Sequence, residues 1–509
     1  MLNKKNYKSL CDVCDRVLLL PCVTFECVAV SWLHIIREHP FFLEKYSDVF
    51  SDKKYALNAC RKYLDILIRT IVWGIYCIRS LYLNKGTVKS KENLPDKIDI
   101  LFISHLLSVS HADEKNDFYF GEMPRRLEEH GKNSLIMLIN HSGKPTKSFI
   151  DEWEKESIHR IIFSDVLKLR DEIIIHFRLV KESLRLRKLA VLEKQGLMKN
   201  VLLISSKEAL TSSTHENMRM AKQVESLVSK LRPKAIIVTY EGHAWERLFF
   251  CAARKSVPDV QCIGYQHALL FKRQHAIRRN LNAEYNPDKI LTSGVMAQET
   301  LKKSPNIGRI PIYAVGSNRV YKKYKNLEEN FSSDHQVSYD FSCLVVPEGI
   351  LSECNILFEF SLVCANLFPN VNFIWRLHPV LSFELLLNKN KNFRSLPKNI
   401  KLSNRAYEKD VEVCQWVLYR GTTAVVQAVV SGLRPIYLQK FNEMSIDPLY
   451  GLEDWRIKIN SEQDFKKQIE KDISEQFHLI QGKEQIKAIE YCKKLFKPID
   501  SVALFTALA

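Results

Sequence analysis

The feature that most constrains the fold is a series of short apolar runs, each ending in polar residues, between residues 371 and 438. Val371–Trp375 and Trp416–Tyr419 are rich in β-branched and aromatic residues and are bounded by residues that break regular structure. Such runs are typical of buried strands in a parallel sheet. In an open α/β sheet, ligands bind at the carboxyl ends of the strands. We therefore expect a binding site where these two runs end.

Strand-like runs alternate with helical patterns over most of the chain. One group of expected strands comprises residues 98–103, 134–139, 160–163, 234–239, 260–265, 289–292 and 310–315, and a second comprises 341–346, 371–375, 400–402, 416–419 and 435–438. The polar segment 324–339 between the groups is typical of a linker. Sustained alternation indicates parallel sheets with helices on both faces. The predicted fold class is α/β, with two Rossmann-like domains facing a central cleft and an N-terminal helical region.

The expected organisation has four parts. They are a helical N-terminal region at residues 1–95, a Rossmann-like acceptor domain at 96–325, a Rossmann-like nucleotide-sugar domain at 338–490 and a helical tail at 491–509. A chain of 509 residues with 46% hydrophobic residues is long enough to build two such domains with buried cores.

The N-terminal region carries two long apolar stretches, at residues 17–35 and 64–83. A membrane-spanning helix needs about 20 apolar residues with few charges, and an ionised Glu26 or Arg69 at the middle of a bilayer is costly. Two alternatives remain: helices that pack on the next domain, and interfacial helices that contact a membrane. The basic residues that flank the stretches suit an anionic lipid surface: Lys4, Lys5, Lys8, Lys53, Lys54, Arg61, Lys62, Lys85, Lys89 and Lys91.

Glu241 follows the expected strand at residues 234–239 and precedes Gly242 and His243. A carboxylate at the end of a strand, facing a cleft, is able to act as a general base toward an acceptor hydroxyl. The alternative is a carboxylate in the first turn of the next helix, where the helix dipole favours it. His243 has two alternatives as well, because it either orients a substrate or caps the turn. We predict that all three residues line the cleft.

His378 ends the expected strand at residues 371–375 together with Arg376 and Pro379. Pro379 favours an extended backbone at His378, which keeps the imidazole at the mouth of the strand. There it is able to bond a phosphate oxygen and to protonate a leaving group. Arg376 lies two residues earlier, on the same face in strand geometry, and would add a phosphate contact. The alternative is a histidine that bonds a loop carbonyl.

A second phosphate-binding pattern is Arg420-Gly421-Thr422-Thr423, which opens the helix expected at residues 424–431. The glycine permits a tight turn, and the hydroxyls suit a phosphate. Capping of the helix alone would also explain the threonines. Glu348 and Gly349 follow the strand at 341–346, where they would contact a nucleoside or ribose, although turn chemistry explains them equally well.

Further cleft residues are expected at the ends of strands in the first group. Gln266 and His267 follow the strand at 260–265 and are predicted to line the acceptor side of the cleft. Residues 117–121, with the sequence Asp-Phe-Tyr-Phe-Gly, follow the first strand and form a candidate acceptor loop.

Composition and absent motifs narrow the function classes. The net charge of +17 indicates an anionic partner such as a nucleotide phosphate or an anionic lipid. The basic helices have no interleaved aromatics and no recognised module, so we expect no nucleic-acid partner. The sequence has no GxxxxGK[ST] loop, no HExxH and no Asp-x-Asp, so we expect neither a metal site nor a cofactor. Thirteen cysteines without a regular framework, and no evident secretory signal, predict a cytoplasmic protein.

The chain resembles the GT-B glycosyltransferases, and among them bacterial surface-carbohydrate biosynthesis proteins. It is similar to transferases that use CMP-activated 2-keto-3-deoxy sugars, namely sialyltransferases and 3-deoxy-octulosonate transferases. Their acidic-Gly motif matches Glu241-Gly242, their His-Pro motif matches His378-Pro379, and their paired-hydroxyl motif matches Thr422-Thr423. The resemblance covers roughly residues 97–490. Two departures are Tyr240, where a second acidic residue is usual, and the Thr-Thr pair, where Ser is common.

This resemblance implies an inverting, metal-independent transfer of a sugar from a CMP-linked donor to a saccharide or lipid-linked acceptor. Glu241 would be the base, His378 the phosphate ligand and acid, and Thr422 and Thr423 phosphate binders. The expected location is the cytoplasm, with the inner face of the membrane as the alternative. Two other functions remain open: a polyol-phosphate transferase that uses CDP-glycerol, and a non-catalytic nucleotide- or sugar-binding subunit of a polysaccharide assembly complex.

Overall fold

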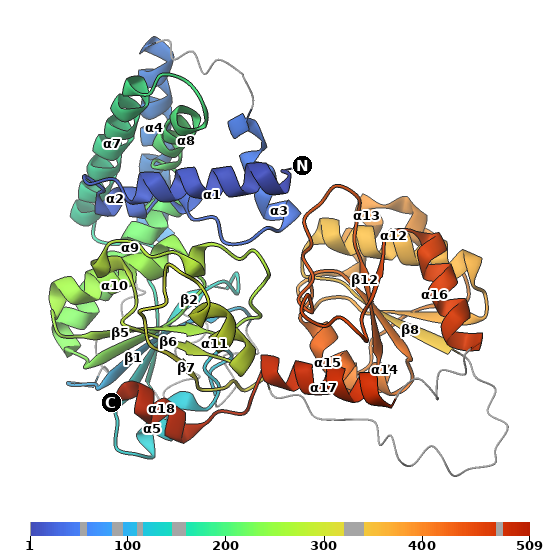
Figure 1. Ribbon diagram of the computed structural model, residues 1–509. Helices are drawn as coiled ribbons and strands as arrows, with labels where there is room; N and C mark the ends of the chain where they lie inside the picture. Colours follow the sequence, from blue (N-terminus) through green and yellow to red (C-terminus); the bar gives the residue numbers. More distant parts are fainter. Residues whose placement is uncertain are drawn as a thin grey trace.

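The computed structural model describes residues 2–50, 59–83, 95–108, 116–144, 159–319, 341–474 and 482–509. Within these residues the strands form two sheets, which lie side by side with helices around each (Figure 1). Every strand pair in both sheets is parallel. The expected linker at 324–339 lies outside the described residues.

The first sheet has the strand order β3-β2-β1-β4-β5-β6-β7 within the described residues. Its strands are β1 (Ile100–Leu106), β2 (Ser134–Asn140), β3 (His159–Ile162), β4 (Ala235–Thr239), β5 (Gln261–Gln266), β6 (Lys289–Thr292) and β7 (Ile312–Ala314). Successive residues of β1 point into two different cores. Leu101 and Ile103 belong to one apolar cluster, and Ile100 and Phe102 belong to another. Both faces of this sheet are therefore covered, as the near-continuous apolar runs predict.

The second sheet has the order β10-β9-β8-β11-β12-β13 within the described residues. Its strands are β8 (Phe341–Val346), β9 (Val371–Trp375), β10 (Ile400–Leu402), β11 (Trp416–Tyr419), β12 (Arg434–Leu438) and β13 (Ile457–Ile459). The expected strands of both sheets form within three residues of their predicted ends. β13 is an addition, and it is a short edge strand whose middle residue, Lys458, is exposed.

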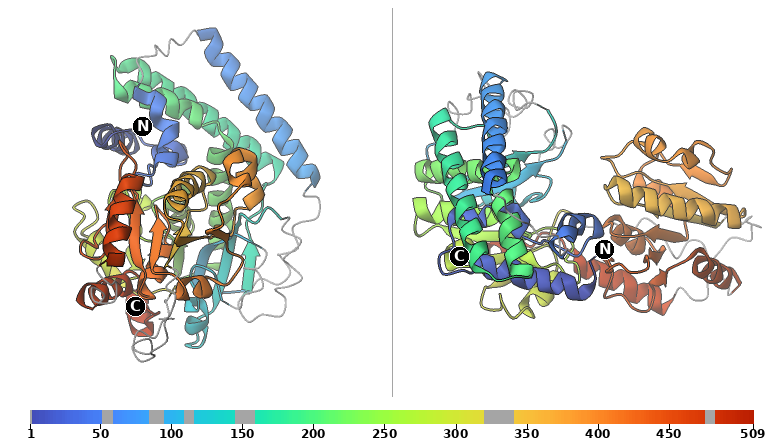
Figure 2. Two further views of the ribbon diagram at one scale, coloured as in Figure 1. Left: turned by 90° about the vertical axis from the view of Figure 1, so that its right-hand side faces the viewer. Right: turned by 90° about the horizontal axis from the view of Figure 1, so that it is seen from above.

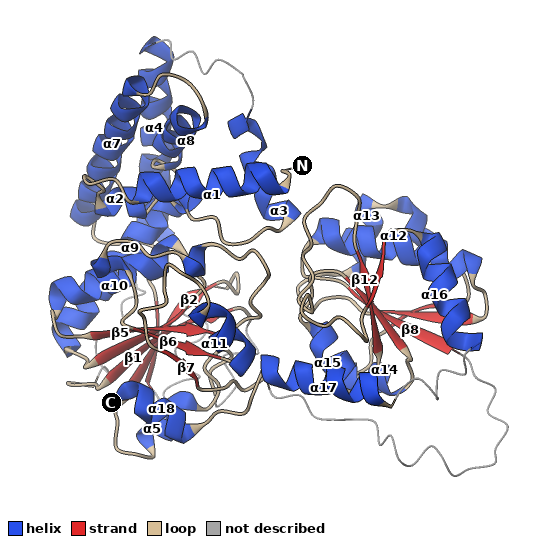
Figure 3. Cartoon of the chain, in the orientation of Figure 1, coloured by secondary structure: helices blue, strands red, loops and turns tan. Residues whose placement is uncertain are grey.

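Helices cover both sheets on both faces (Figure 3). Around the first sheet they are α5 (Met123–Glu128), α9 (Ser212–Leu231), α10 (Ala244–Ser256), α11 (Val295–Lys302) and α18 (Ser501–Leu508). Around the second they are α12 (Leu351–Leu367), α13 (Phe383–Lys389), α14 (Tyr407–Glu412), α15 (Ala424–Val430), α16 (Glu462–Ser474) and α17 (Lys483–Leu495). The fold class is thus α/β with two parallel, Rossmann-like sheets, as predicted.

A helical layer lies above the first sheet in Figure 1. It combines α1 (Lys4–Leu18), α2 (Phe25–Val28), α3 (Pro40–Leu43), α4 (Ala59–Leu83), the 3-10 helices η1 (Ser31–Leu33) and η2 (Glu44–Phe50), α7 (Leu169–Leu192) and α8 (Leu197–Glu208). The two apolar stretches of the N-terminal region differ in structure, because residues 64–83 lie within the single long helix α4. Residues 17–35 break into short helices, and Val28, Ala29 and Leu33 are fully buried in the same core as the sheet. None of the helices that the structure describes combines the length and the apolar character needed to traverse a bilayer.

The end of the chain ties the two sheets together. α17 packs against α15 on one side and α11 on the other, and α18 then packs against β7. Gly294 and Gly316 permit the C-terminal segment to pack this closely on the first sheet, because a Cβ atom at either would lie 2.1–2.2 Å from a carbonyl oxygen of Leu495 or Pro498. Arg126 of α5 completes the contact by donating hydrogen bonds to the carbonyl of Ile499 and the hydroxyl of Ser501.

Candidate functional site

One cavity of about 530 Å³ lies where the two sheets and the N-terminal segment meet. Its lining residues come from three parts of the chain: Ser31, His34, Ile35, Ile36, Arg37, Phe42, Leu43, Lys45 and Tyr46; Glu241, His243, Ala268 and Phe271; and Glu348, Gly349, His378, Gly421, Thr422 and Thr423. The last two groups follow the carboxyl ends of β4, β5, β8, β9 and β11. The structure therefore brings Glu241 from one sheet to the same cavity as His378 and the threonines from the other.

A second cavity of about 580 Å³ lies at the opposite edge of the first sheet. It includes Asp99, Lys234 and Gln261, which stand at the amino ends of strands, and Phe505 of α18. Its Lys234 and Asp99 already form an ion pair at 2.9 Å. Because ligands of α/β sheets bind at the carboxyl ends of strands, the first cavity is the candidate site.

The turn that carries Glu241 is held rigidly between β4 and α10. Gly242 has a φ of +92°, and a Cβ atom there would lie 2.3 Å from the carbonyl carbon of Ala276. The Glu246 carboxylate accepts hydrogen bonds from the backbone N–H groups of Glu241, Gly242 and His243 at 2.6–3.0 Å. Glu246, rather than Glu241, is therefore the carboxylate that caps α10, which leaves the Glu241 side chain available to the cavity.

Glu241 is surrounded by cationic and imidazole groups. Its side chain is 28% exposed, and its Oε2 lies 3.6 Å from Nε2 of His243. Burial raises the pKa of the Glu241 carboxyl, but the His243 contact and the charges of His267, His243 and Arg37 lower it to about 2. Burial lowers the pKa of His243, but Glu241 and Glu246 raise it above its ordinary value. The pair is therefore a carboxylate beside an imidazole that holds its proton more tightly than usual.

Aromatic and histidine rings continue from Glu241 along the carboxyl edge of the first sheet. His267 packs edge-on against Tyr119 with ring centroids 4.5 Å apart, and burial lowers the pKa of His267 to about 4. His105 contacts both Tyr119 and Trp245 edge-on. Gln266 is buried and donates to the carbonyl of Ala268. Gln266 and His267 thus support the wall beside the cavity, and Tyr119 brings the candidate acceptor loop to the same edge.

On the other side of the cavity, Glu348 and His378 pack on two glycines. A Cβ atom at Gly421 would lie 2.0 Å from Oε1 of Glu348, and one at Gly349 would lie 2.9 Å from Nδ1 of His378. Nδ1 of His378 accepts a bond of 3.4 Å from the N–H of Val380, so Nε2 carries the proton of the neutral ring. Burial lowers the pKa of His378, against the opposing charge of Glu348. His378 therefore presents a neutral N–H donor.

The two threonines differ in their own bonds. Thr422 Oγ1 accepts a hydrogen bond of 3.3 Å from the N–H of Ala424, so it caps the start of α15. Thr423 is the N-cap residue by position, but its side chain makes no capping bond. Its hydroxyl is therefore not committed to the helix.

Three other predicted phosphate ligands do not line the cavity. Arg376 forms an ion pair of 2.9 Å with Asp410 and donates to the carbonyl of Arg405. Arg420 is buried and forms ion pairs with Glu353 at 2.6 Å and with Glu443 at 2.7 Å. Pro379 is absent from the lining residues, and so is Gly242, which supports the turn instead. In this structure both arginines serve as buried or partly buried structural cations.

The N-terminal segment supplies the cavity with a cation that no local sequence pattern singles out. Nη2 of Arg37 lies 3.4 Å from Oε2 of Glu348, and its guanidinium stacks over the Phe271 ring at 4.3 Å. His39 accepts from the N–H of Phe41 at Nδ1, so its Nε2 donates to Oε1 of Glu348 at 3.1 Å. Burial raises the pKa of Glu348, but His39 and Arg37 lower it below its ordinary value.

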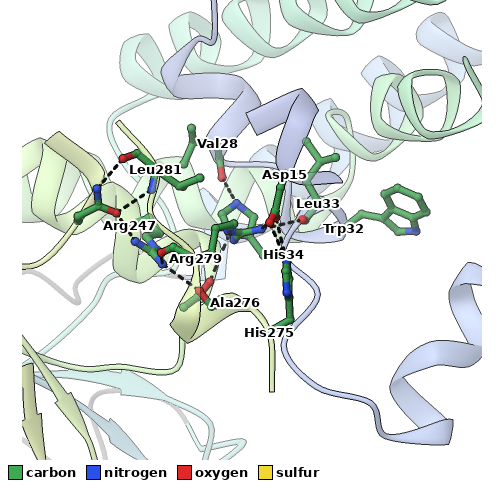
Figure 4. Close-up of polar contacts among 12 residues, drawn as sticks. Asp15, Val28, Trp32, Leu33, His34, Arg247, His275, Ala276, Arg279 and Leu281 are labelled. Atoms are coloured by element: carbon green, nitrogen blue, oxygen red, sulfur yellow. Dashed lines mark hydrogen bonds and ion pairs between the residues drawn. The ribbon is translucent and has the colours of Figure 1, made fainter. Parts of the chain in front are cut away.

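Buried polar contacts fasten this segment to the first sheet (Figure 4). Arg279 donates to Nδ1 of His34 at 2.7 Å and to Asp15 at 3.1 Å, and His275 contacts the same Asp15 at 2.9 Å. Arg247 donates to the carbonyls of Ala276 and Arg279 at 2.9 and 2.8 Å. The network thus holds His34, which lines the cavity three residues before Arg37, and the N-terminal segment is part of the site.

His39, Glu348 and Glu353 bring one imidazole and two carboxylate atoms within 4.8 Å of one another. Both carboxylates already have cationic partners, since Glu348 pairs with Arg37 and Glu353 with Arg420. The group therefore links the N-terminal segment to the second sheet through paired charges.

No protein-family model matches the chain, and no curated protein matches it. Among solved structures, the chain is similar to the glycotransferase of kitacinnamycin (11% identity, 81% of this chain and 99% of that chain, TM-score 0.45). It is also similar to Anabaena Alr3699/HepE in complex with UDP and glucose (11% identity, 81% and 98%, TM-score 0.45). A third is Methanocaldococcus jannaschii UDP-GlcNAc 2-epimerase in complex with UDP-GlcNAc and UDP (12% identity, 79% and 94%, TM-score 0.42).

Proposed function

We propose that this protein is a glycosyltransferase that transfers a sugar from a nucleotide-linked donor to a saccharide acceptor in bacterial surface polysaccharide biosynthesis. The observation that carries the proposal is the single cavity of about 530 Å³ that holds Glu241 on one side and His378, Thr422 and Thr423 on the other. A carboxylate base and a set of phosphate-binding groups are the two parts that metal-independent transfer requires. From the motif resemblance, the proposed donor is a CMP-activated 2-keto-3-deoxy sugar.

In this proposal the donor phosphate binds on the side of the second sheet. His378 offers its Nε2–H, and Thr423 offers a hydroxyl that makes no capping bond. Arg37 adds a positive charge at the same cavity, where it also pairs with Glu348. Charge-assisted hydrogen bonds to an anion are roughly twice as strong as neutral ones. Arg37 and His378 would therefore stabilise the negative charge that develops on the departing nucleotide.

The acceptor hydroxyl binds near Glu241. Its oxygen attacks the anomeric carbon as the bond from that carbon to the phosphate oxygen breaks, its proton passes to Glu241, and the electron pair leaves with the nucleotide. A carboxyl group with a pKa of about 2 is ionised but weakly basic. An anionic donor bound nearby raises that pKa, because a like charge disfavours the carboxylate. The base therefore becomes stronger when the donor is in place.

The test measures turnover with a panel of CMP-, UDP- and GDP-sugars, scored as transfer, donor hydrolysis or epimerisation of the sugar. We expect transfer from a CMP-sugar, and a loss of at least about 100-fold in kcat for Glu241→Gln. Matched controls are Glu470→Gln and His159→Ala, because both side chains are exposed and neither lines the cavity. Unchanged turnover in both Glu241→Gln and His378→Ala would remove the assignment.

Other outcomes identify the alternatives. Turnover of CDP-glycerol alone would identify a polyol-phosphate transferase. Tight binding of CMP or UDP by calorimetry without any turnover would identify a non-catalytic binding subunit. In both cases Arg37→Gln should weaken nucleotide binding about tenfold more than nucleoside binding, because the arginine contacts the phosphate. Equal weakening of both would place Arg37 outside the phosphate site.

A further inference from the structure

The long helix α4 turns its apolar side chains outward. Between Leu64 and Ile78, eight large apolar side chains are between 43% and 71% exposed: Leu64, Leu67, Ile68, Ile71, Val72, Ile75, Tyr76 and Ile78. Their spacing of three and four residues places them on one face of the helix. Figure 2 shows α4 at the edge of the molecule, running along its outside. Monomeric proteins rarely leave so large a continuous apolar face in water.

The inner face of the same helix is more polar than the outer one. Thr70 shares a hydrogen bond of 3.0 Å with His176 of α7, and Trp73 stacks on the same His176 with ring centroids 4.1 Å apart. The Sγ of Cys77 contacts Glu172, which in turn accepts hydrogen bonds from Arg219 of α9. A helix that packs on a soluble core shows the reverse pattern, with apolar residues inside and polar residues outside. The arrangement of α4 is therefore suited to an apolar environment on its outer side.

The sequence that contains and flanks α4 is rich in lysine and arginine. Arg79 is exposed at its end. In sequence, the helix is preceded by Lys53 and Lys54, begins with Arg61 and Lys62 among its first residues, and is followed by Lys85, Lys89 and Lys91. α7, against which α4 packs, adds exposed apolar residues and exposed cations: Leu169, Ile173 and Phe177, with Arg170 and Lys181. A second copy of this chain would bring the same positive charge to the face and would be repelled, whereas an anionic lipid surface is attracted.

We propose that the outer face of α4 binds the surface of an anionic membrane, with the helix lying in the plane of the interface. The face supplies the apolar insertion and its basic surroundings supply the attraction to lipid headgroups, which is the combination that interfacial helices use. The proposal concerns a surface separate from the cavity, so it stands or falls independently of the proposed reaction.

The experiment is vesicle flotation of the full chain with phosphatidylcholine vesicles and with vesicles that also contain phosphatidylglycerol. The wild type binds the mixed vesicles, and binding falls with added salt because the charges are screened. The variant Ile71→Glu/Ile75→Glu binds at least about tenfold more weakly, since two carboxylates oppose both insertion and the anionic surface. The matched control Phe441→Glu/Val502→Glu changes two apolar residues elsewhere in the chain that are even more exposed, and it binds as the wild type does.

Thermal unfolding and light scattering complete the test. Because Ile71 and Ile75 are exposed, the variant should unfold at the wild-type temperature, so a loss of binding reports the surface. Absence of wild-type binding to mixed vesicles, or equal binding of the two double variants, would overturn the proposal. It would also be overturned by a wild-type dimer that Ile71→Glu/Ile75→Glu converts to a monomer, because a second copy would then cover the face.

Discussion

The two sides of the cavity are built with very different rigidity. On the side of the first sheet, the Glu241 turn is fixed by a positive-φ glycine against the Ala276 backbone and by four hydrogen bonds to one buried carboxylate. On the side of the second sheet, the His378 side chain accepts one hydrogen bond of 3.4 Å and the Thr423 side chain makes no capping bond. This contrast is consistent with a base that must be pre-positioned and a phosphate site that its ligand completes. Four substitutions or conditions test the contrast, in order of decreasing effect.

Gly242→Ala should have the largest effect on stability. The new Cβ atom would meet backbone atoms of Ala276 at 2.3–2.4 Å, and the backbone φ of +92° disfavours a side chain. We expect a loss of at least about 3 kcal/mol in the free energy of unfolding, measured by chemical denaturation. Gly131→Ala is the matched control, because Gly131 also has a positive φ of +73° but no heavy atom within 4 Å of a new Cβ. The control should lose only about 1 kcal/mol. Equal losses in the two variants would show that the turn at Gly242 rearranges easily around the new Cβ atom.

The rigid side also predicts a pH dependence. The folded pKa of Glu241 is about 2, below its ordinary value of 4.5, so the folded state binds a proton less tightly than the unfolded state. Its contribution to stability is therefore present above pH 4.5 and is lost as the pH falls from there toward 2. We expect about 2 kcal/mol from this group after allowance for its partial exposure. Somewhat more than half of this contribution is lost by pH 3, so the unfolding free energies at pH 6 and pH 3 should differ by about 1 kcal/mol less in Glu241→Gln than in the wild type. An identical pH dependence would contradict the assigned environment.

Much of this architecture could be predicted from the sequence because its signals are local. Most strands of the two sheets are short runs of apolar residues, so their positions are set by neighbours in the chain. The rule that ligands bind at the carboxyl ends of parallel strands placed Glu241 and His378 each at the binding edge of its own sheet. The expectation of two domains facing a central cleft then placed both residues at one site. β13 escaped prediction because three residues with one exposed lysine give little periodic signal.

The charged groups were harder to predict because their partners are distant in sequence. Arg37 and Glu348 are 311 positions apart, and no local pattern links them. Arg376 has the right strand spacing for a phosphate ligand, but Asp410 pairs with it in the folded chain. Arg420 is likewise paired by Glu353 of α12. The residue types at strand ends therefore indicate where the site lies. Whether a charged side chain there is able to bind a ligand depends on the ion pairs that it forms with other elements of the fold.

Gly421→Ala tests the other side of the cavity. The new Cβ atom would lie 2.0 Å from Oε1 of Glu348, which is closer than the contact at Gly242. The obstacle is the end of a side chain rather than backbone, so Glu348 is able to move once its bonds to Arg37 and His39 shift. We expect a loss of about 1.5 kcal/mol, smaller than for Gly242→Ala despite the closer contact. Denaturation of both variants under the same conditions decides the order, and a larger loss in Gly421→Ala would reverse the contrast.

The two threonines give the smallest and most selective effect. Thr422→Ala removes the hydrogen bond that the N–H of Ala424 donates to the Thr422 hydroxyl and should cost about 1 kcal/mol, as the loss of a helix cap does. Thr423→Ala removes a hydroxyl that caps nothing and should stay within about 0.5 kcal/mol of the wild type. Nucleotide affinity should change in the opposite order. Thr423→Ala should bind nucleotide clearly more weakly than the wild type, although its stability is nearly unchanged. If Thr423→Ala destabilises the fold as much as Thr422→Ala and leaves nucleotide binding intact, then the second hydroxyl serves the helix, and the phosphate site has to be assembled from His378 and Arg37 alone.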